Sequence, residues 1–288
     1  MTQPSPEWYD TQYNNRARIP EHLEILEGWA NASALVREQA QCELDVRYGS
    51  GEGETLDVFP VAGTGAPVLV YIHGGYWRAL DKRDQSFVAP AFTSAGALVI
   101  VPNYALCPAV TIEHIALQMT RALAWVWRNA ARYGGNPNHI IVTGHSAGGH
   151  LAAMMLSCDW KAVGEDLPER LVKGALSISG VFDLEPLRHA PFVASDLRLT
   201  AESARKLSPA GFPRPASGVL YALVGADESE EFVRQNQLIR DAWGAVAVPV
   251  CETLPGCHHL SVLRGLADAD QRLHRLALQL LGLGVSAG

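Results

Sequence analysis

A five-residue segment near the middle of the chain has the residue types and spacing of a turn that presents a nucleophilic serine. Residues 144–148 read Gly-His-Ser-Ala-Gly, which places Ser146 at the centre of a G-x-S-x-G motif. An apolar run at residues 140–142 precedes the motif, and a helix-forming run at residues 151–156 follows it. A strand, a sharp turn and a helix in this order would raise the serine hydroxyl above the edge of a sheet, within reach of a base. The motif predicts a nucleophile at Ser146; the alternative is a glycine-rich turn that only packs.

A second segment, upstream of the serine, has the composition of an oxyanion hole. Residues 68–72 form a short apolar, β-branched run that predicts a buried strand, and residues 73–77 follow it with the sequence His-Gly-Gly-Tyr-Trp. Glycine allows backbone N–H groups to approach a developing oxyanion closely. We therefore expect the amides of Gly74, Gly75 and Ala147 to stabilise the negative charge that forms when the serine attacks.

The loop after a predicted strand at residues 219–224 supplies two candidates for the acid of a catalytic triad. A serine hydroxyl is a weak nucleophile without a base, and the base needs an orienting acid. Asp227 and Glu228 both lie in this loop. Hydrolases of this type commonly place the carboxylate three positions after a glycine, and that spacing from Gly225 favours Glu228. Asp227 is the commoner residue type for the role, so it stays open as the alternative.

The loop after the next predicted strand, at residues 247–250, supplies the base. In the expected fold the triad residues follow one another as serine, acid and histidine, and His258 and His259 lie at the right point of the chain. Both loops follow parallel strands, so they reach the same edge of the sheet as the serine. We expect His259 to be the base, and His258 to be either a pocket residue or a residue in the layer of side chains behind the pocket. His73 is expected to be structural, and Cys257 is not expected to act as a nucleophile.

Strands and helices alternate along most of the chain, which predicts a mainly parallel sheet with helices on both faces, in one domain over residues 1–288. Thr111 is a predicted helix cap, since apolar residues recur after it at helical spacing. A helical extension at residues 1–40 and a proline-rich stretch at residues 185–213 interrupt the alternation. We expect both to contribute to a small lid or cap, with surface decoration as the alternative for the extension. The strands are expected at residues 68–72, 97–101, 140–142, 175–178, 219–224 and 247–250.

The composition argues against several other classes of protein. The 288-residue chain has a formal net charge of −7 and no basic cluster, so we expect no binding to nucleic acid or to an anionic membrane. No apolar run approaches the roughly 18 residues of a membrane span, and residues 1–10 lack a signal-peptide core. The five cysteines form no C-x-x-C pair and the histidines show no metal-binding spacing, so we expect free thiols, no metal and no cofactor. These features predict a soluble cytoplasmic protein, and they leave open whether it forms a homodimer.

Taken together, these motifs resemble those of the kynurenine formamidase (arylformamidase) family of serine-dependent α/β-hydrolases. Residues 73–77 match the H-G-G-x-W signature of that family, and residues 144–156 match its nucleophile block over a long run. The similarity runs from about residue 56 to about residue 266. It continues through Ser179-Gly180-Val181-Phe182-Asp183-Leu184-Glu185-Pro186, Leu207-Ser208-Pro209, Glu231-Phe232 and Arg234-Gln235.

The resemblance implies an α/β-hydrolase fold and hydrolysis of an aryl formamide, with N-formyl-L-kynurenine as the substrate. Tyr76 and Trp77 would then wall the aromatic subsite, although Trp77 could instead only anchor its loop. Two positions depart from the family pattern. The acid is usually Asp, whereas the aligned residue here is Glu228, and the residue before the base is often Asp or Asn, whereas here it is His258.

Other readings of the same residues remain open. Arg78, Arg188 and Glu185 are candidates for binding the carboxylate and ammonium groups of an amino-acid substrate. The same triad would serve a broad carboxylesterase acting on small aryl or short-chain acyl esters, because fold and triad do not determine the acyl acceptor. In either case the expected partner is a small aromatic amide or ester. A non-catalytic binding protein with a hydrolase fold is the alternative from a different class.

Overall fold

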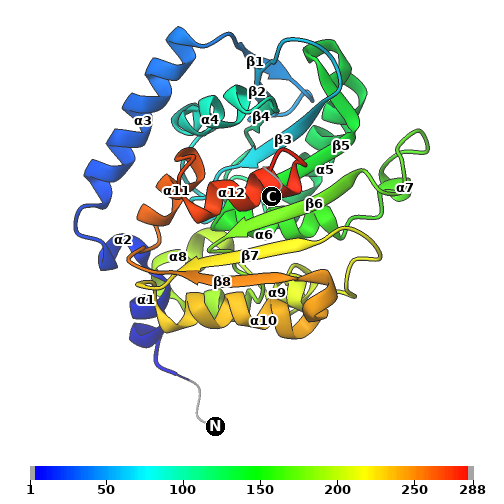
Figure 1. The fold of residues 1–288 in the computed structure, drawn as a ribbon. Helices are drawn as coiled ribbons and strands as arrows, with labels where there is room; N and C mark the ends of the chain where they lie inside the picture. Colours follow the sequence, from blue (N-terminus) through cyan, green and yellow to red (C-terminus); the bar gives the residue numbers. More distant parts are fainter. Residues whose placement is uncertain (1–3, 285–288) are drawn as a thin grey trace.

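A single eight-stranded sheet runs through the part of the chain that the structure, a computed structural model, describes, namely residues 4–284 (Figure 1). The ends of the predicted domain, residues 1–3 and 285–288, lie outside the described residues. The strand order across the sheet is β1-β2-β4-β3-β5-β6-β7-β8. The strands are β1 (Glu43–Arg47), β2 (Thr55–Phe59), β3 (Ala66–Ile72), β4 (Leu98–Pro102), β5 (Gly135–His145), β6 (Val172–Ile178), β7 (Leu220–Gly225) and β8 (Val250–Leu254).

The strands from β4 to β8 are parallel, whereas β2 pairs antiparallel with both β1 and β4. The predicted α/β-hydrolase class is therefore confirmed. The sequence did not predict β1 and β2. Strand β1 alternates exposed and half-buried residues at the edge of the sheet, and its sequence Glu-Leu-Asp-Val-Arg carries little of the apolar pattern from which the inner strands were predicted.

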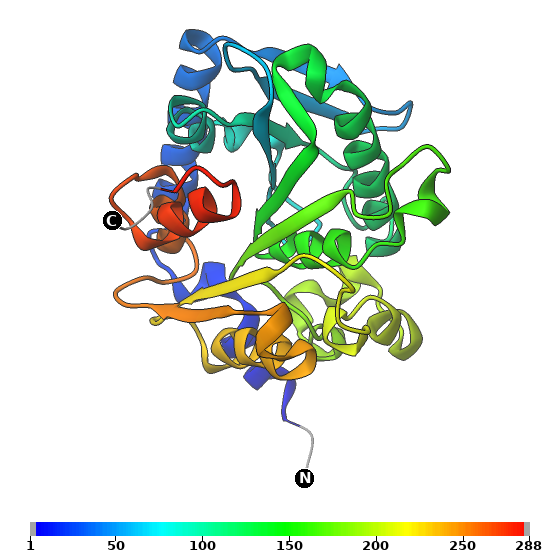
Figure 2. The ribbon, with the colours of Figure 1, turned by 45° about the vertical axis from the view of Figure 1, so that its right-hand side comes forward.

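Helices cover both faces of the sheet, because inner-strand side chains point alternately to the two sides. In β3, Val68 and Val70 belong to the core under α5 and α6, whereas Leu69 and Tyr71 belong to the core under α4 and α12. Figure 2 shows the C-terminal helices, coloured orange to red, on the opposite side of the sheet from the green helices. The α-helices of this part are α4 (Ala89–Ser94), α5 (Ile112–Asn129), α6 (Ala147–Leu156), α7 (Trp160–Val163), α10 (Glu230–Ala247), α11 (Arg264–Ala267) and α12 (Arg272–Leu280).

Two local predictions are tested by the element boundaries. Thr111 caps α5 as predicted, because its hydroxyl accepts a hydrogen bond from the amide of His114 at 3.2 Å. The strand expected at residues 247–250 was placed too early. Helix α10 continues to Ala247 through a kink at Gly244, so β8 begins only at Val250.

Both segments that interrupt the alternation pack together near the carboxyl edge of the sheet. The N-terminal extension forms α1 (Pro6–Tyr13), α2 (Asn15–Arg18) and α3 (His22–Gln39). Residues 185–213 include α8 (Pro191–Leu197) and α9 (Ala201–Lys206). Helix α1 packs on α8, where the amide of Phe192 donates to the carboxylate of Asp10 at 3.1 Å. The two segments of the expected lid, one N-terminal and one from the second half of the chain, therefore contact each other.

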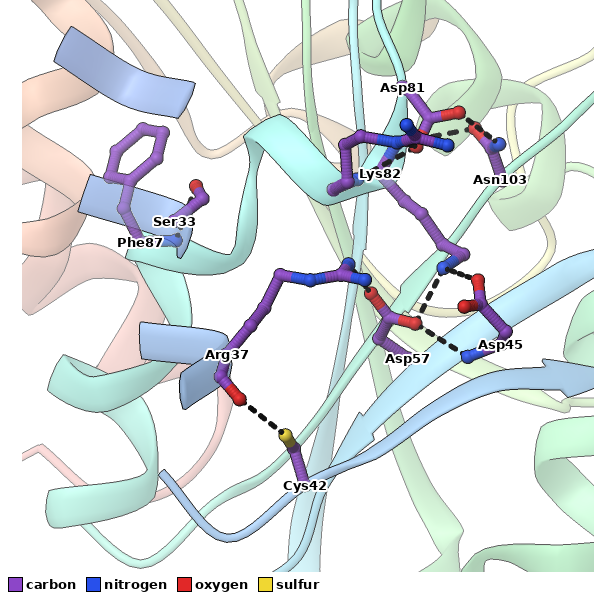
Figure 3. Close-up of polar contacts among 10 residues, drawn as sticks. Ser33, Arg37, Cys42, Asp45, Asp57, Asp81, Lys82, Phe87 and Asn103 are labelled. Atoms are coloured by element: carbon purple, nitrogen blue, oxygen red, sulfur yellow. Dashed lines mark hydrogen bonds and ion pairs between the residues drawn. The ribbon is translucent and has the colours of Figure 1, made fainter. Parts of the chain in front are cut away.

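A buried cluster of charges ties the C-terminal half of α3 to the sheet (Figure 3). The ammonium group of Lys82, only 2% exposed, lies 2.6 Å from the carboxylates of both Asp57 and Asp45. The second oxygen of Asp57 accepts a hydrogen bond from Arg37 of α3 at 2.6 Å. Because Asp57 is fully buried in β2, this network connects the helix to a strand that cannot move independently of the core.

None of the helices within residues 4–284 combines the length and the apolar character needed to cross a membrane.

Candidate active site

The turn between β5 and α6 holds Ser146 in a strained backbone conformation. Its φ and ψ angles are 57° and −117°, a region that residues with a Cβ rarely adopt. The turn is tight because Gly148 lies against β3, and a Cβ at that position would lie 2.0 Å from the carbonyl oxygen of Ile72. The amide of Ser146 donates to the carbonyl oxygen of Ile178 in the neighbouring strand at 2.8 Å. The two glycines of the motif thus allow the strand-turn-helix arrangement that the sequence predicted.

His259 and Glu228 form a hydrogen-bonded pair beside this turn. Nδ1 of His259 lies 2.6 Å from Oε2 of Glu228, and both side chains are almost completely buried. The ring of Phe232 packs against the imidazole with the centroids 4.5 Å apart. Since Nδ1 is engaged by the carboxylate, Nε2 is the nitrogen left for another partner, and Ser146 and His259 line the same pocket. The three residues have the types of a serine-histidine-acid triad, and the acid contacts the imidazole at Nδ1 as such a triad requires.

The structure distinguishes the two candidate acids. Glu228 accepts three hydrogen bonds, since its Oε1 also receives the hydroxyl of Ser179 at 2.5 Å and the amide of Gly225 at 2.8 Å. Asp227 is exposed to solvent, and its backbone amide donates to the carbonyl oxygen of Cys257 in the loop of the base. Ser179 was not singled out from the sequence. Its position directly after β6, a parallel strand beside the serine strand, is the signal that could have pointed to it.

A second histidine, His145, lies against the candidate base. Its Nε2 lies 2.7 Å from the carbonyl oxygen of His259, and the two rings are 4.7 Å apart. Complete burial, together with the neighbouring imidazole, holds the pKa of His145 well below its ordinary value. His145 is therefore neutral and donates its Nε2 proton to that carbonyl, which keeps the loop of the base in place.

His258 does not line the pocket that contains Ser146, but it lines a neighbouring cavity together with Glu228 and His259. Its Nδ1 accepts hydrogen bonds from the amides of Leu260 and Ser261, both at 3.2 Å. Its Nε2 lies 3.4 Å from Glu21 of the N-terminal extension. The side chain therefore stabilises the loop after β8 and connects it to the N-terminal extension.

The predicted oxyanion-hole residues lie around the serine. A Cβ on Gly74 would be 2.7 Å from the carbonyl oxygen of His145 and 3.2 Å from the Cβ of Ser146, so glycine allows this close approach. Within the described residues no acceptor receives the amide of Gly74 or Gly75, and Ala147 is the first residue of α6, where amides have no intrahelical acceptor. His73 is fully buried and stacks on Tyr104 at 4.2 Å, which agrees with a structural role in this loop.

The pocket in front of the serine has mostly apolar walls and about 610 Å³ of atom-free space, including its mouth. Tyr76 lies in the wall as expected. Trp77 does not, because it is completely buried with its ring against His150 at 5.0 Å, so the predicted contact of Trp77 with substrate is wrong. The apolar and aromatic wall residues are Leu26, Trp29, Tyr76, Leu80, Phe192 and Leu260.

The three residues considered for binding an amino-acid group lie in different places. Arg78 lines the pocket, where it forms an ion pair with Asp196 and its guanidinium lies 5.6 Å from the ring centre of Phe192. Arg188 and Glu185 form an ion pair with each other and are not among the residues that line this pocket.

Comparison with known proteins places this site in a family. A family model described as BD-FAE matches residues 56–189. The kynurenine formamidase of Danio rerio is 32% identical over 267 residues, covering 88% of this chain and 88% of the relative. The esterase LipQ of Mycobacterium tuberculosis is 32% identical over 240 residues, which cover 75% of this chain and 56% of that protein. A crystal structure from Silicibacter sp. TM1040, provisionally described as a thioesterase, is 31% identical with a TM-score of 0.79, covering 92% of this chain and 96% of the other. With its fold, its triad arrangement and its similarity to the first of these relatives, the chain belongs to the kynurenine formamidase family of α/β-hydrolases.

Proposed function

We propose that this protein hydrolyses N-formyl-L-kynurenine to L-kynurenine and formate, with Ser146 as the nucleophile. The observation that carries the proposal is the His259–Glu228 pair beside a strained serine in a pocket with aromatic walls. Membership of a family whose relatives bear the name kynurenine formamidase supports the choice of substrate.

In the first half of the reaction, Nε2 of His259 takes the hydroxyl proton of Ser146 as the oxygen attacks the formyl carbon. The carbonyl oxygen becomes an oxyanion, and the amides of Gly74, Gly75 and Ala147 donate hydrogen bonds to it. The carbon–nitrogen bond then breaks while the protonated imidazole gives its proton to the aniline nitrogen. The amine product leaves, and the formyl group remains on the serine oxygen as an ester.

In the second half, His259 takes a proton from a water molecule that attacks the formyl ester. The bond to the serine oxygen breaks, the imidazole returns the proton to that oxygen, and formate leaves. Glu228 stabilises the imidazolium in both halves, because its carboxylate is held by the donors of Ser179 and Gly225 as well as by the imidazole. An arylamine leaves more readily than an alkylamine, so the chemistry suits an aryl formamide.

Hydrolysis of small aryl or short-chain acyl esters is the second candidate, favoured by the similarity to LipQ. The same nucleophile, base and oxyanion hole would act on an ester, and the apolar pocket would accept its aryl group. What separates the two functions is the preference between acyl acceptors.

Measuring kcat/KM for N-formyl-L-kynurenine and for phenyl acetate with the purified protein tests the proposal. We expect the formamide to be the better substrate. A large excess in favour of the ester would instead establish the esterase. Ser146→Ala should lower kcat by at least about 10⁴-fold while ligand binding persists. Unchanged turnover in that variant would exclude the serine mechanism.

We also propose that the protein acts in the cytoplasm. All five cysteines are unpaired in the structure, as the reducing conditions of that compartment favour.

A further inference from the structure

The pocket in front of Ser146 is positively charged. Two arginines are among the residues that line it, Arg16 from α2 and Arg78 from the loop after β3, and no aspartate or glutamate is. A pocket with cationic side chains and apolar walls favours a ligand that has both an anionic and an aromatic part.

The two arginines differ in how their charge is used. Arg78 forms an ion pair with Asp196 and packs over Phe192. Its charge is therefore already balanced, and its side chain forms part of the pocket wall. Arg16 is exposed, and within residues 4–284 no carboxylate forms an ion pair with it. Its guanidinium is therefore the cation of the pocket that is available to an incoming anion.

Asn15, the neighbour of Arg16, supplies an independent observation. The residue is only 6% exposed, and its Nδ2 is buried with no hydrogen-bond acceptor among the described residues. A buried donor without an acceptor destabilises the protein unless a ligand satisfies it, so such groups point to binding sites. Asn15 lines the pocket with Ser146 and His259, and it also lines a neighbouring cavity that reaches Glu228.

The position of α2 brings both residues to the catalytic loops. Figure 1 shows α2 beside the carboxyl ends of β7 and β8, from which Glu228 and His259 follow. The carbonyl oxygen of Tyr13, just before α2, accepts the hydroxyl of Tyr76 at 2.6 Å, and the hydroxyl of Tyr13 donates to Glu231 at 2.5 Å. These buried contacts hold α2 in position against the pocket.

We propose that Asn15 and Arg16 determine specificity by binding a carboxylate group of the substrate, which makes the enzyme selective for aryl acyl substrates that are anionic. This inference rests on the proposed function for the reaction. It adds the residues that recognise the carboxylate of the substrate. Arg16 contributes the opposite charge, and the amide of Asn15 donates to a carboxylate or neighbouring carbonyl oxygen.

Two aryl formamides that differ only in one group test the proposal: N-formyl-L-kynurenine, which carries a carboxylate, and its primary carboxamide. We expect Arg16→Gln to lower kcat/KM for the carboxylate by about 10-fold or more through KM, and to change the carboxamide value less than about 2-fold. Arg47→Gln is the matched control. Arg47 is exposed in β1, at the edge of the sheet opposite β8, and lines neither this pocket nor the neighbouring cavity, so the ratio of the two substrates should not change.

Asn15→Asp provides a second, nearly isosteric variant. A carboxylate at this position repels an anionic substrate, so kcat/KM for the carboxylate should fall at least about 10-fold relative to the carboxamide, and less so at high salt. The proposal is overturned if Arg16→Gln and Asn15→Asp affect both substrates equally or affect neither.

Two aryl acetates, one with a carboxylate and one with a primary carboxamide in its place, distinguish failure of this inference from failure of the proposed function. If only the acetates are cleaved, and Arg16→Gln removes a preference for the anionic acetate, the formamidase function fails and the specificity role stands. If the formamides are cleaved with no dependence on their charge, the function stands and the role of Asn15 and Arg16 is wrong.

Discussion

Glu228, the acid of the proposed mechanism, is one methylene longer than the aspartate that the resemblance to the family leads one to expect. Its carboxylate reaches His259 from a loop whose backbone turns back on Gly225, and Ser179 holds the oxygen that the imidazole does not use. The three donors together fix the orientation of the carboxylate, so the extra methylene does not leave it mobile. The position of the Glu228 carboxylate therefore depends on the serine that follows β6 as well as on its own loop.

Replacing the acid should be far more harmful than replacing its neighbour. Glu228→Gln should lower kcat by about 10³–10⁴-fold, because an amide no longer stabilises the imidazolium and favours the wrong tautomer of His259. Asp227→Asn should change kcat by less than about 3-fold, since the side chain is exposed. Steady-state kinetics on the best substrate measure both, and the reverse ranking would mean that Asp227 is the acid.

At the scale of residues, the candidate site was predictable wherever a role follows from a short stretch of sequence. Ser146 and His259 were expected from strand-loop patterns, and the structure places them at one pocket. Trp77 and Ser179 were not predictable in the same way. Trp77 has a φ of 55° that turns its ring into the core, and Ser179 matters only because folding brings it to Glu228.

At the scale of elements, the attachment of α3 to the sheet depends on buried charges. Lys82 comes from the loop after β3, Asp57 from β2 and Arg37 from α3, so three elements distant in sequence meet in one network (Figure 3). Sequence patterns could not indicate this contact. Strands β1 and β2 were themselves missed, and ion pairs between distant elements leave no periodic signal.

Removing one member of this network should be costly. Asp57→Ala removes the fully buried one of the two carboxylates that contact Lys82, and it also removes the partner of Arg37, so we expect the free energy of unfolding to fall by about 3–5 kcal/mol. Arg128→Ala removes an ion pair with Asp166 whose two side chains are about half exposed, and should cost less than about 1 kcal/mol. Urea denaturation of both variants measures the difference, and equal losses would show that burial of the network is unimportant.

At the scale of the whole molecule, three fully buried histidines surround the nucleophile segment and should make the fold sensitive to acid. Burial lowers the pKa of His73, His145 and His150, the last to about 4. At a pH between the ordinary pKa of histidine and these lowered pKa values, the unfolded chain binds protons at these three residues and the folded chain does not. Unfolding therefore takes up protons, and stability decreases as the pH falls below about 6.5.

For His150 alone this effect amounts to about 3 kcal/mol when the pH falls from about 6.5 to 4. His150→Gln keeps a donor for the carbonyl oxygen of Leu207, which lies 2.7 Å from Nε2, but it removes the titrating group. We expect this variant to lose stability less steeply between pH 6.5 and 5. Calorimetric unfolding at several pH values measures the slopes, and identical slopes for the two proteins would contradict the assignment.

The participation of α2 and α3 in the pocket wall has a consequence for how relatives diverge. The proposed catalytic residues come from loops of the parallel sheet, whereas part of the pocket wall comes from the N-terminal stretch. This stretch is joined to α10 by the hydrogen bond between Tyr13 and Glu231. A chimera that receives this stretch from another family member should acquire the substrate preference of that member and keep the reaction of the recipient. The residues that correspond to Tyr13 and Glu231 would have to be transferred together, because they form the contact between the two parts.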